Sequence, residues 1–140
     1  MSRTAAWEPP LLVDMIHENT YSERKQTMRF MMIIKANEAS EAGEMPSREM
    51  IEAMNDYNEE MLNAGVMLAG EGLHPSSEGA RIYLRAGKRT VTDGPFAETK
   101  EVLGGYYMIK TDDLDLALEA AARCPGAFYG SIEVRPIVEM

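Results

Sequence analysis

The sequence predicts an α+β domain built around one antiparallel sheet. Apolar segments of strand length alternate with two segments of helical periodicity, and polar or glycine-containing segments separate them. Their order along the chain is strand, helix, strand, hairpin, strand, helix, strand. This order is typical of the split βαβ, or ferredoxin-like, plan, in which two helices cover one face of the sheet. The length of 140 residues allows one such domain.

Different periodicities predict the first strand and the first helix. Residues 30–34 form a continuous apolar run, which is typical of a strand buried on both faces. Residues 37–46 are polar and predict a loop. After Ser47, a suitable N-cap, apolar residues recur at helical spacing until Gly65, which suits the left-handed position after a last helical turn. We therefore expect a helix between Ser47 and Gly65.

The remaining elements follow from the same signals. Asp112 is a suitable cap for a second helix, and Pro125 ends that helix because proline has no backbone N–H to donate. The other predicted elements are a strand (66–69), a loop (70–79), a hairpin (81–85 and 90–93), a strand (103–110) and a last strand (131–135).

The two helices leave the second face of the predicted sheet without a cover. A domain of this size usually hides such a face by pairing with a second copy of itself. We therefore expect a homodimer, and twofold symmetry is the commonest arrangement.

The N-terminal segment lies outside this pattern. Strand-like sequence begins abruptly at Met28, whereas the residues before it carry scattered charges of both signs. We expect residues 1–27 to be an extension or arm and residues 28–140 to be the domain. If the extension is ordered, Trp7 and the apolar residues within 11–16 are expected to pack against a partner subunit.

The charge balance excludes several partners. The chain has 14 Lys and Arg against 23 Asp and Glu, a formal charge of −9 and a pI near 4.7. A surface this acidic repels the phosphates of nucleic acids and the anionic lipids of membranes. No apolar run approaches the roughly 18–20 residues of a membrane-spanning helix. We therefore expect neither a nucleic-acid nor a membrane partner.

Cysteine usage indicates the compartment. Cys124 is the single cysteine, so no disulfide can form within the chain, and this fits the reducing cytoplasm. A lone thiol beside Pro125 is more typical of a small packed hydrophobic residue than of a nucleophile.

The sequence contains no motif that predicts a metal or a cofactor. His17 and His74 lie far apart, and His17, in the extension, is expected at the surface. No CxxC, HExxH, P-loop or complete dinucleotide fingerprint occurs in the chain. We therefore expect no protein-bound metal and no cofactor.

Two loops carry the candidate chemistry. Glu71 and His74 are acid–base candidates, because imidazole titrates near neutral pH. Asp93, at the end of a predicted strand, can orient His74 and stabilise its cationic form. The alternative is structural: Asp93 precedes a Gly-Pro pair that favours a turn, and His74 is then a solvated side chain. The further candidates for substrate binding are Arg81 or Arg135 as an anion clamp, Phe96 and Tyr106 as walls of an apolar pocket, and Pro95 in the turn.

These residues resemble a known family. Residues 92–101 (TDGPFAETKE), followed by 104–107 (GGYY), resemble the signature of the DGPF branch of the YCII-related proteins. Residues 28–31, 69–76 and 133–136 resemble the same branch, so that the resemblance covers residues 28–140. It implies a ferredoxin-like domain that pairs as a dimeric α/β barrel.

The resemblance implies less about activity. It suggests similarity to small lyases and isomerases, and an association of the DGPF branch with extracytoplasmic-function sigma factors. Short YCII-related proteins carry a His–Asp site whose histidine lies in the first helix. Here that helix has Met54, Tyr57 and Asn58 but no histidine, so this site cannot be carried over.

Two hypotheses about function remain open, and whether the protein is an enzyme is undecided between them. The first is a cofactor-free enzyme that transfers a proton on a small cyclic or anionic substrate, with His74 as base and Asp93 as its orienter. The second is a non-catalytic dimeric module that binds a small molecule or serves in regulation.

Overall fold

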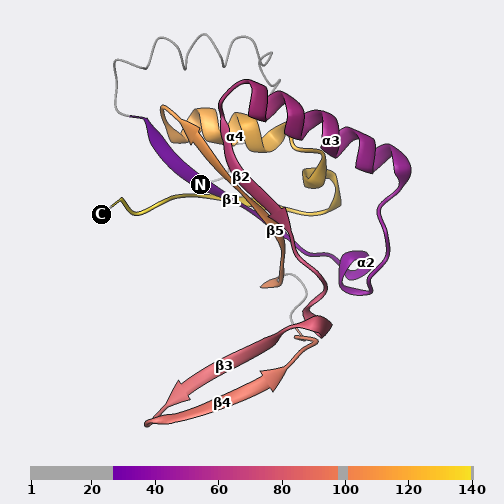
Figure 1. Ribbon diagram of the computed structural model, residues 1–140, viewed down its shortest axis with the longest axis vertical. Coiled ribbons are helices and arrows are strands. Elements are labelled where there is room, and N and C mark those ends of the chain that lie inside the picture. Colours follow the sequence, from indigo (N-terminus) through magenta and orange to yellow (C-terminus); the bar gives the residue numbers. More distant parts are fainter. Residues whose placement is uncertain (1–26, 98–100, 140) are drawn as a thin grey trace.

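The structure, a computed structural model, describes residues 27–97 and 101–139 and confirms the predicted α+β class. Strands and two longer helices form two layers, with both helices on one side of the sheet (Figure 1). The elements are β1 (Met28–Lys35), α2 (Glu38–Glu41), α3 (Arg48–Asn63), β2 (Met67–Gly72), β3 (Ala80–Arg85), β4 (Lys88–Asp93), β5 (Leu103–Thr111), α4 (Leu114–Ala122) and β6 (Ile132–Pro136).

The strand order identifies the topology. Four strands of the described residues form the main sheet in the order β2-β5-β1-β6, and every neighbouring pair is antiparallel. α3 connects β1 to β2 and α4 connects β5 to β6, which is the ferredoxin-like arrangement. β3 and β4 pair with each other in a separate hairpin that extends away from the sheet (Figure 1).

The core lies between the sheet and the two helices. Phe30, Met32 and Ile109 are fully buried on the helix side of the sheet. Tyr57 of α3 donates a hydrogen bond of 2.7 Å to the carbonyl oxygen of Ala120 in α4. This bond satisfies a buried hydroxyl and joins the two helices directly.

The opposite face of the sheet is uncovered in the single chain. Met31 pairs across the strands with Met108, and Ile33 with Tyr106, so these four side chains share that face. They are half-buried, whereas Phe30 and Met32, which lie on the helix side of β1, are fully buried. The expectation that residues 30–34 are buried on both faces is therefore wrong for the isolated chain. We name this surface the open face.

The N-cap of α3 is the residue that the sequence predicts, whereas the N-cap of α4 is one residue later than predicted. Ser47 caps α3 by accepting a hydrogen bond from Met50 N, and Gly65 follows with φ +73°. The N-cap of α4 is Asp113, which accepts from Leu116 N, and not Asp112. Adjacent aspartates offer the same chemistry, and only the backbone geometry selects one of them.

Two predicted loops contain short regular elements. The segment 37–46 includes α2, whose capping box pairs Asn37 with Ser40. In the segment 70–79, β2 continues to Gly72 and a 3-10 turn forms over Ser76–Glu78. Such short elements lack the periodic apolar residues that identify a helix or strand in a sequence.

Candidate functional site

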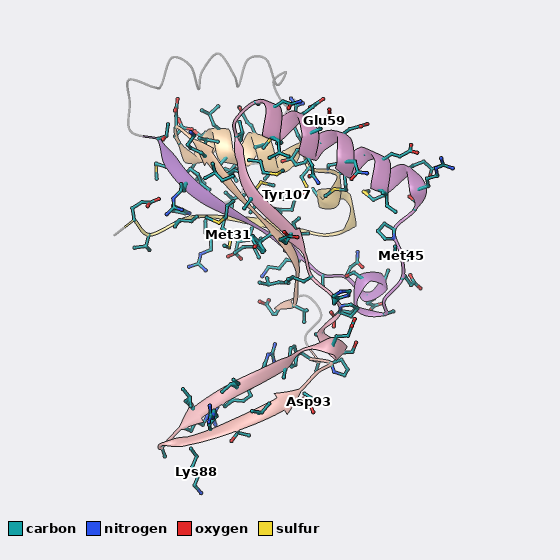
Figure 2. The ribbon with its side chains drawn as sticks, viewed as in Figure 1. Met31, Met45, Glu59, Lys88, Asp93 and Tyr107 are labelled. Carbon is teal, nitrogen blue, oxygen red and sulfur yellow. The ribbon has the colours of Figure 1, made fainter. Side chains whose placement is uncertain are left out.

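A cavity of about 590 Å³ opens between the N-terminal half of α3 and the paired strands β2 and β5. In Figure 2, Tyr107 lies between the sheet and α3, and Met45 lies in the segment that leads into α3. The lining is mixed: Met45, Met50 and Met54 supply flexible apolar groups, and Asn58 and Tyr107 supply polar ones. This combination of apolar wall and few polar groups is typical of a small-molecule site.

Glycines keep the sheet side of the cavity free of side chains. Gly70, Gly72, Gly104, Gly105 and Gly126 all line it. A Cβ at Gly70 would overlap the Tyr107 ring, and one at Gly105 would lie 2.9 Å from the Glu71 carbonyl oxygen. A Cβ at Gly72 would meet nothing within 4 Å. Gly70 and Gly105 therefore lie where a side chain would collide with the protein, whereas Gly72 borders open space on the sheet side of the cavity.

The polar groups of the cavity form a defined pair. The Tyr107 hydroxyl donates a hydrogen bond of 2.6 Å to Asn58 Oδ1. Burial raises the pKa of Tyr107 to about 12, so this hydroxyl stays protonated at neutral pH. The Tyr57 ring packs edge-to-face against Tyr107, with 6.0 Å between ring centroids. The pair is held rigidly and offers the remaining lone pairs and amide hydrogens to a ligand.

The two predicted catalytic residues lie away from this cavity. The His74 side chain is 87% exposed, and its Nδ1 lies 3.4 Å from the Glu78 carboxylate. Asp93 is exposed at the end of β4, where it pairs with Ala80. Among the described residues, no hydrogen bond or ion pair joins His74 to Asp93. Their catalytic role stays a prediction.

The other predicted ligand residues are divided among three places: the cavity, the last strand and the base of the hairpin. Glu71 lies opposite Tyr106 across β2 and β5, and it lines the cavity. Arg135, on β6, lies opposite Met31 of β1, and the Arg135 Nε is 3.8 Å from the Glu133 carboxylate.

The base of the hairpin brings Arg81, Pro95 and Phe96 together. The Arg81 guanidinium lies 3.8 Å from the centroid of the Phe96 ring, close enough for a cation–π interaction. Pro95 follows Gly94 through a cis peptide bond. Phe96 N donates 3.1 Å to Ser76 Oγ. Residues 93–96 (DGPF) are therefore hydrogen-bonded to the loop that follows β2.

Glu41 holds this loop from the other side. Its carboxylate accepts a hydrogen bond of 2.9 Å from Ser76 N and a second one from Ser76 Oγ. Ser76 is buried, although serine is usually exposed. Gly94 N donates 3.0 Å to the Gly79 carbonyl oxygen, and a Cβ at Gly94 would overlap the Ser76 carbonyl. We name these contacts among Glu41, Ser76, Gly94 and Phe96 the hairpin clamp.

The comparison with known families agrees with this architecture. Residues 28–140 match the YCII-related domain. The chain belongs to the YCII-related family. An uncharacterised protein of Rhizobium meliloti (strain 1021) is 46% identical over 67 residues, which cover 46% of this chain and 54% of the relative. The chain thus spans about half the length of the curated relative it matches.

Further properties of this YCII-related domain bear on the chemistry. Cys124 is fully buried, as predicted, and burial raises the pKa of its thiol. No described helix has the length and apolar character needed to cross a bilayer. Within residues 27–97 and 101–139, no three metal-ligating side chains gather at one point.

Trp7 and His17 lie outside the described residues, as do all but the last residue of the proposed extension, residues 1–27.

The sequence analysis named Glu71 of the cavity and Phe96 of the clamp as candidates, but it missed the side-chain pairs that form the two sites. Asn58 and Tyr107 lie 49 positions apart, and Glu41 and Ser76 lie 35 apart, so no local pattern connects them. The glycine pairs at 70/72 and 104/105 were the available signal, because glycine within a strand often marks a close approach.

Proposed function

We propose that this YCII-related protein binds a small cyclic molecule in the cavity between α3 and strands β2 and β5. The observation that carries the proposal is the cavity itself, whose sheet side is lined by glycines and is open at Gly72. Its volume of about 590 Å³ lies within the range of roughly 300–1,000 Å³ that is common for ligand pockets. The methionine wall suits an apolar ring, and Asn58 with Tyr107 suits one polar substituent.

Binding without catalysis is the better supported form of this proposal. A base must come within hydrogen-bond reach of the proton that it removes. His74 is 87% exposed and does not line the cavity, and Asp93 does not line it either. The Tyr107 hydroxyl is held protonated by its raised pKa and donates its proton to Asn58, so it does not serve as a base.

A proton-transfer enzyme remains the second candidate, and one observation favours it. The loops that carry His74 and Asp93 are bonded to each other, through Gly94 N to the Gly79 carbonyl and Phe96 N to Ser76 Oγ. Once a ligand is known, His74→Ala separates the candidates. Loss of turnover with binding retained supports the enzyme, and binding without turnover in the unchanged protein supports the module.

The proposal includes a homodimer in the cytoplasm. The half-buried apolar side chains of the open face, centred on Ile33 and Met108, support pairing with a second copy. The single buried cysteine fits a reducing compartment. The resemblance of residues 92–101 to the DGPF branch supports placement in that branch and, with it, a regulatory role beside sigma factors.

A cavity-filling variant tests the binding site. Gly72→Leu adds a side chain where a Cβ meets no atom within 4 Å, so it obstructs the cavity without a clash in the fold. The control is Ala122→Leu, which adds similar bulk at an exposed helix end. The probe is the aromatic dye 1-anilinonaphthalene-8-sulfonate, followed by its fluorescence.

The expected result is dye binding to the unchanged protein and to Ala122→Leu, with affinity at least about tenfold weaker in Gly72→Leu. A metabolite panel tested by thermal shift then identifies natural ligands, because a ligand of the native state raises its melting temperature. Equal dye affinity in all three proteins would contradict the cavity as the binding site.

A further inference from the structure

The side chain of Asn58 offers hydrogen-bond donors to the cavity. Its Oδ1 accepts the proton of the Tyr107 hydroxyl at 2.6 Å, so the amide nitrogen, Nδ2, is turned away from that hydroxyl. No residue in the described ranges accepts a hydrogen bond from this nitrogen. Among those residues, Asp112 Oδ1 is the side-chain polar atom that is buried without a partner, so Asn58 Nδ2 is not sealed inside the protein. Because Asn58 lines the cavity, a ligand bound there can reach both amide hydrogens.

Tyr107 fixes the orientation of this amide. An asparagine side chain can turn its amide by 180° and so exchange its donor and its acceptor. Such a turn would leave the hydroxyl hydrogen of Tyr107, a buried residue, without an acceptor, which is costly. The Tyr107 ring itself has little freedom, because Tyr57 packs edge-to-face against it and the ring fills the place where a Cβ of Gly70 would be.

Other polar side chains of the cavity wall serve helix ends. Asn37 and Ser40 form the capping box of α2, and Ser47 accepts a hydrogen bond from Met50 N at the start of α3. The amide hydrogens of Asn58 differ from these groups, because they have no partner in the described part of the chain. They therefore determine which substituent of a ligand fits beside Tyr107.

The charges at the cavity disfavour an anionic substituent. The charged residues of its wall are Glu44, Glu71 and Lys35, a net charge of −1. The Lys35 ammonium lies 3.8 Å from the Glu133 carboxylate and 4.0 Å from that of Glu101, so its charge is already faced by two acidic groups. The whole chain carries −9, which adds to the repulsion of an anion.

We propose that the ligand of this cavity presents an uncharged hydrogen-bond acceptor, such as a carbonyl oxygen on its ring, to the Asn58 amide; this inference rests on the proposed function. The apolar remainder of the ring contacts the methionine wall, and Tyr107 is the positioning residue for the amide. A ligand without an acceptor would displace water from the amide hydrogens and give them no new partner, which weakens its binding.

Three naphthalene probes test this preference. 2-Acetylnaphthalene carries a carbonyl oxygen, 2-isopropenylnaphthalene has the same shape with a CH₂ group in place of that oxygen, and 2-naphthoate carries a negative charge. Dissociation constants are measured by ligand-detected NMR. The isopropenyl probe is more apolar, so the informative quantity is the ratio of its dissociation constant to that of the acetyl probe, compared between protein variants. We name this ratio the acetyl preference.

Asn58→Asp removes the donors and keeps an acceptor for the Tyr107 hydroxyl, because a carboxylate has nearly the size of the amide but no N–H. At pH 8, where the new carboxyl group is ionised, we expect the acetyl preference to fall by about three- to tenfold. The control is Asn55→Asp, which makes the same change at an exposed position of α3 outside the cavity wall. We expect Asn55→Asp to leave the acetyl preference unchanged.

Tyr107→Phe tests the positioning role. It keeps the Asn58 amide but removes the hydroxyl that holds its orientation, so we expect the acetyl preference to fall here too. If Tyr107 had a structural role alone, Tyr107→Phe would weaken the binding of all three probes equally. In the unchanged protein we expect 2-naphthoate to bind more weakly than 2-acetylnaphthalene, and tighter binding of 2-naphthoate would overturn the preference for an uncharged acceptor.

The outcomes separate this inference from the proposed function. Probe binding that is weakened by Gly72→Leu, with the same acetyl preference in Asn58→Asp and in the unchanged protein, overturns the role of Asn58 and leaves the cavity as the binding site. Absence of binding for all three probes, or equal binding in Gly72→Leu, contradicts the cavity as the binding site and overturns this inference with it.

Discussion

Gly94 shows how one residue sets the position of a larger element. Its backbone lies so close to Ser76 that a Cβ would overlap the Ser76 carbonyl oxygen, while its N–H bonds the Gly79 carbonyl. Its role is therefore steric: close approach of two backbones requires the residue without a side chain. The turn chemistry that the sequence indicates around Asp93 does not by itself reveal this contact.

The first prediction concerns this approach. Gly94→Ala is expected to lower the free energy of unfolding by about 1–3 kcal/mol, because the added methyl group forces two backbones apart. Urea unfolding measures the change. The control is Gly79→Ala, whose Cβ would lie at an ordinary 3.6 Å from Ser76 O. Equal stability of Gly94→Ala and the unchanged protein would show that the loop adapts freely.

At the scale of elements, the short helix α2 links the cavity to the β3–β4 hairpin. Asn37, Ser40 and Glu44, in or beside α2, line the cavity, while Glu41 of the same helix holds Ser76. Ser76 Oγ in turn accepts a hydrogen bond from the backbone N–H of Phe96 at the base of the β3–β4 hairpin. A helix of four residues has little stability of its own, so these contacts give α2 its place in the fold.

The second prediction concerns this link. Glu41→Ala removes two acceptors from Ser76, and the cost is expected to be about 1–3 kcal/mol because the Ser76 donors lose their partner. Amide hydrogen exchange is expected to accelerate at Ser76 and Phe96. Glu38→Ala, which removes an exposed carboxylate from the same helix, serves as the control. Unchanged exchange at both amides in Glu41→Ala would contradict the clamp.

At the scale of the whole molecule, the buried hydroxyls and the thiol link folding to pH. Burial raises the pKa of Tyr57, of Tyr107 (to about 12) and of Cys124 above their ordinary values. The folded state therefore holds these protons more tightly than the unfolded state. Their contribution to stability is complete below the ordinary pKa values and is lost as pH rises through the range of the shift.

The third prediction follows from the direction of these pKa shifts. The free energy of unfolding is expected to fall as pH rises from about 9 to 11, because the unfolded tyrosines and thiol ionise first. Tyr107→Phe is expected to make this decline shallower, with the Tyr107 part amounting to at most about 2–3 kcal/mol. Urea unfolding at several pH values measures both slopes. Identical slopes in the two proteins would contradict a raised pKa at Tyr107.

The sequence by itself determined the α+β class, the order of strands and helices along the chain and most element boundaries. Apolar periodicity and caps such as Ser47 act over a few residues, and they are readable without coordinates. The lone cysteine beside Pro125 predicted the burial of Cys124, and a resemblance to a known family singled out residues 92–101. It placed candidate chemistry at His74, because a histidine in a loop is visible in a sequence whereas its exposure is not.

Only the tertiary structure decided which distant residues meet. The pair of Tyr107 and Asn58, the clamp at Ser76 and the glycine-lined side of the cavity each join segments that are far apart along the chain. It also decided that the hairpin stands apart from the main sheet with its apolar residues exposed. Such contacts depend on how packed layers bring separate elements to one point. The local sequence pattern predicts the conformation of each element, but it does not predict which other elements pack against it.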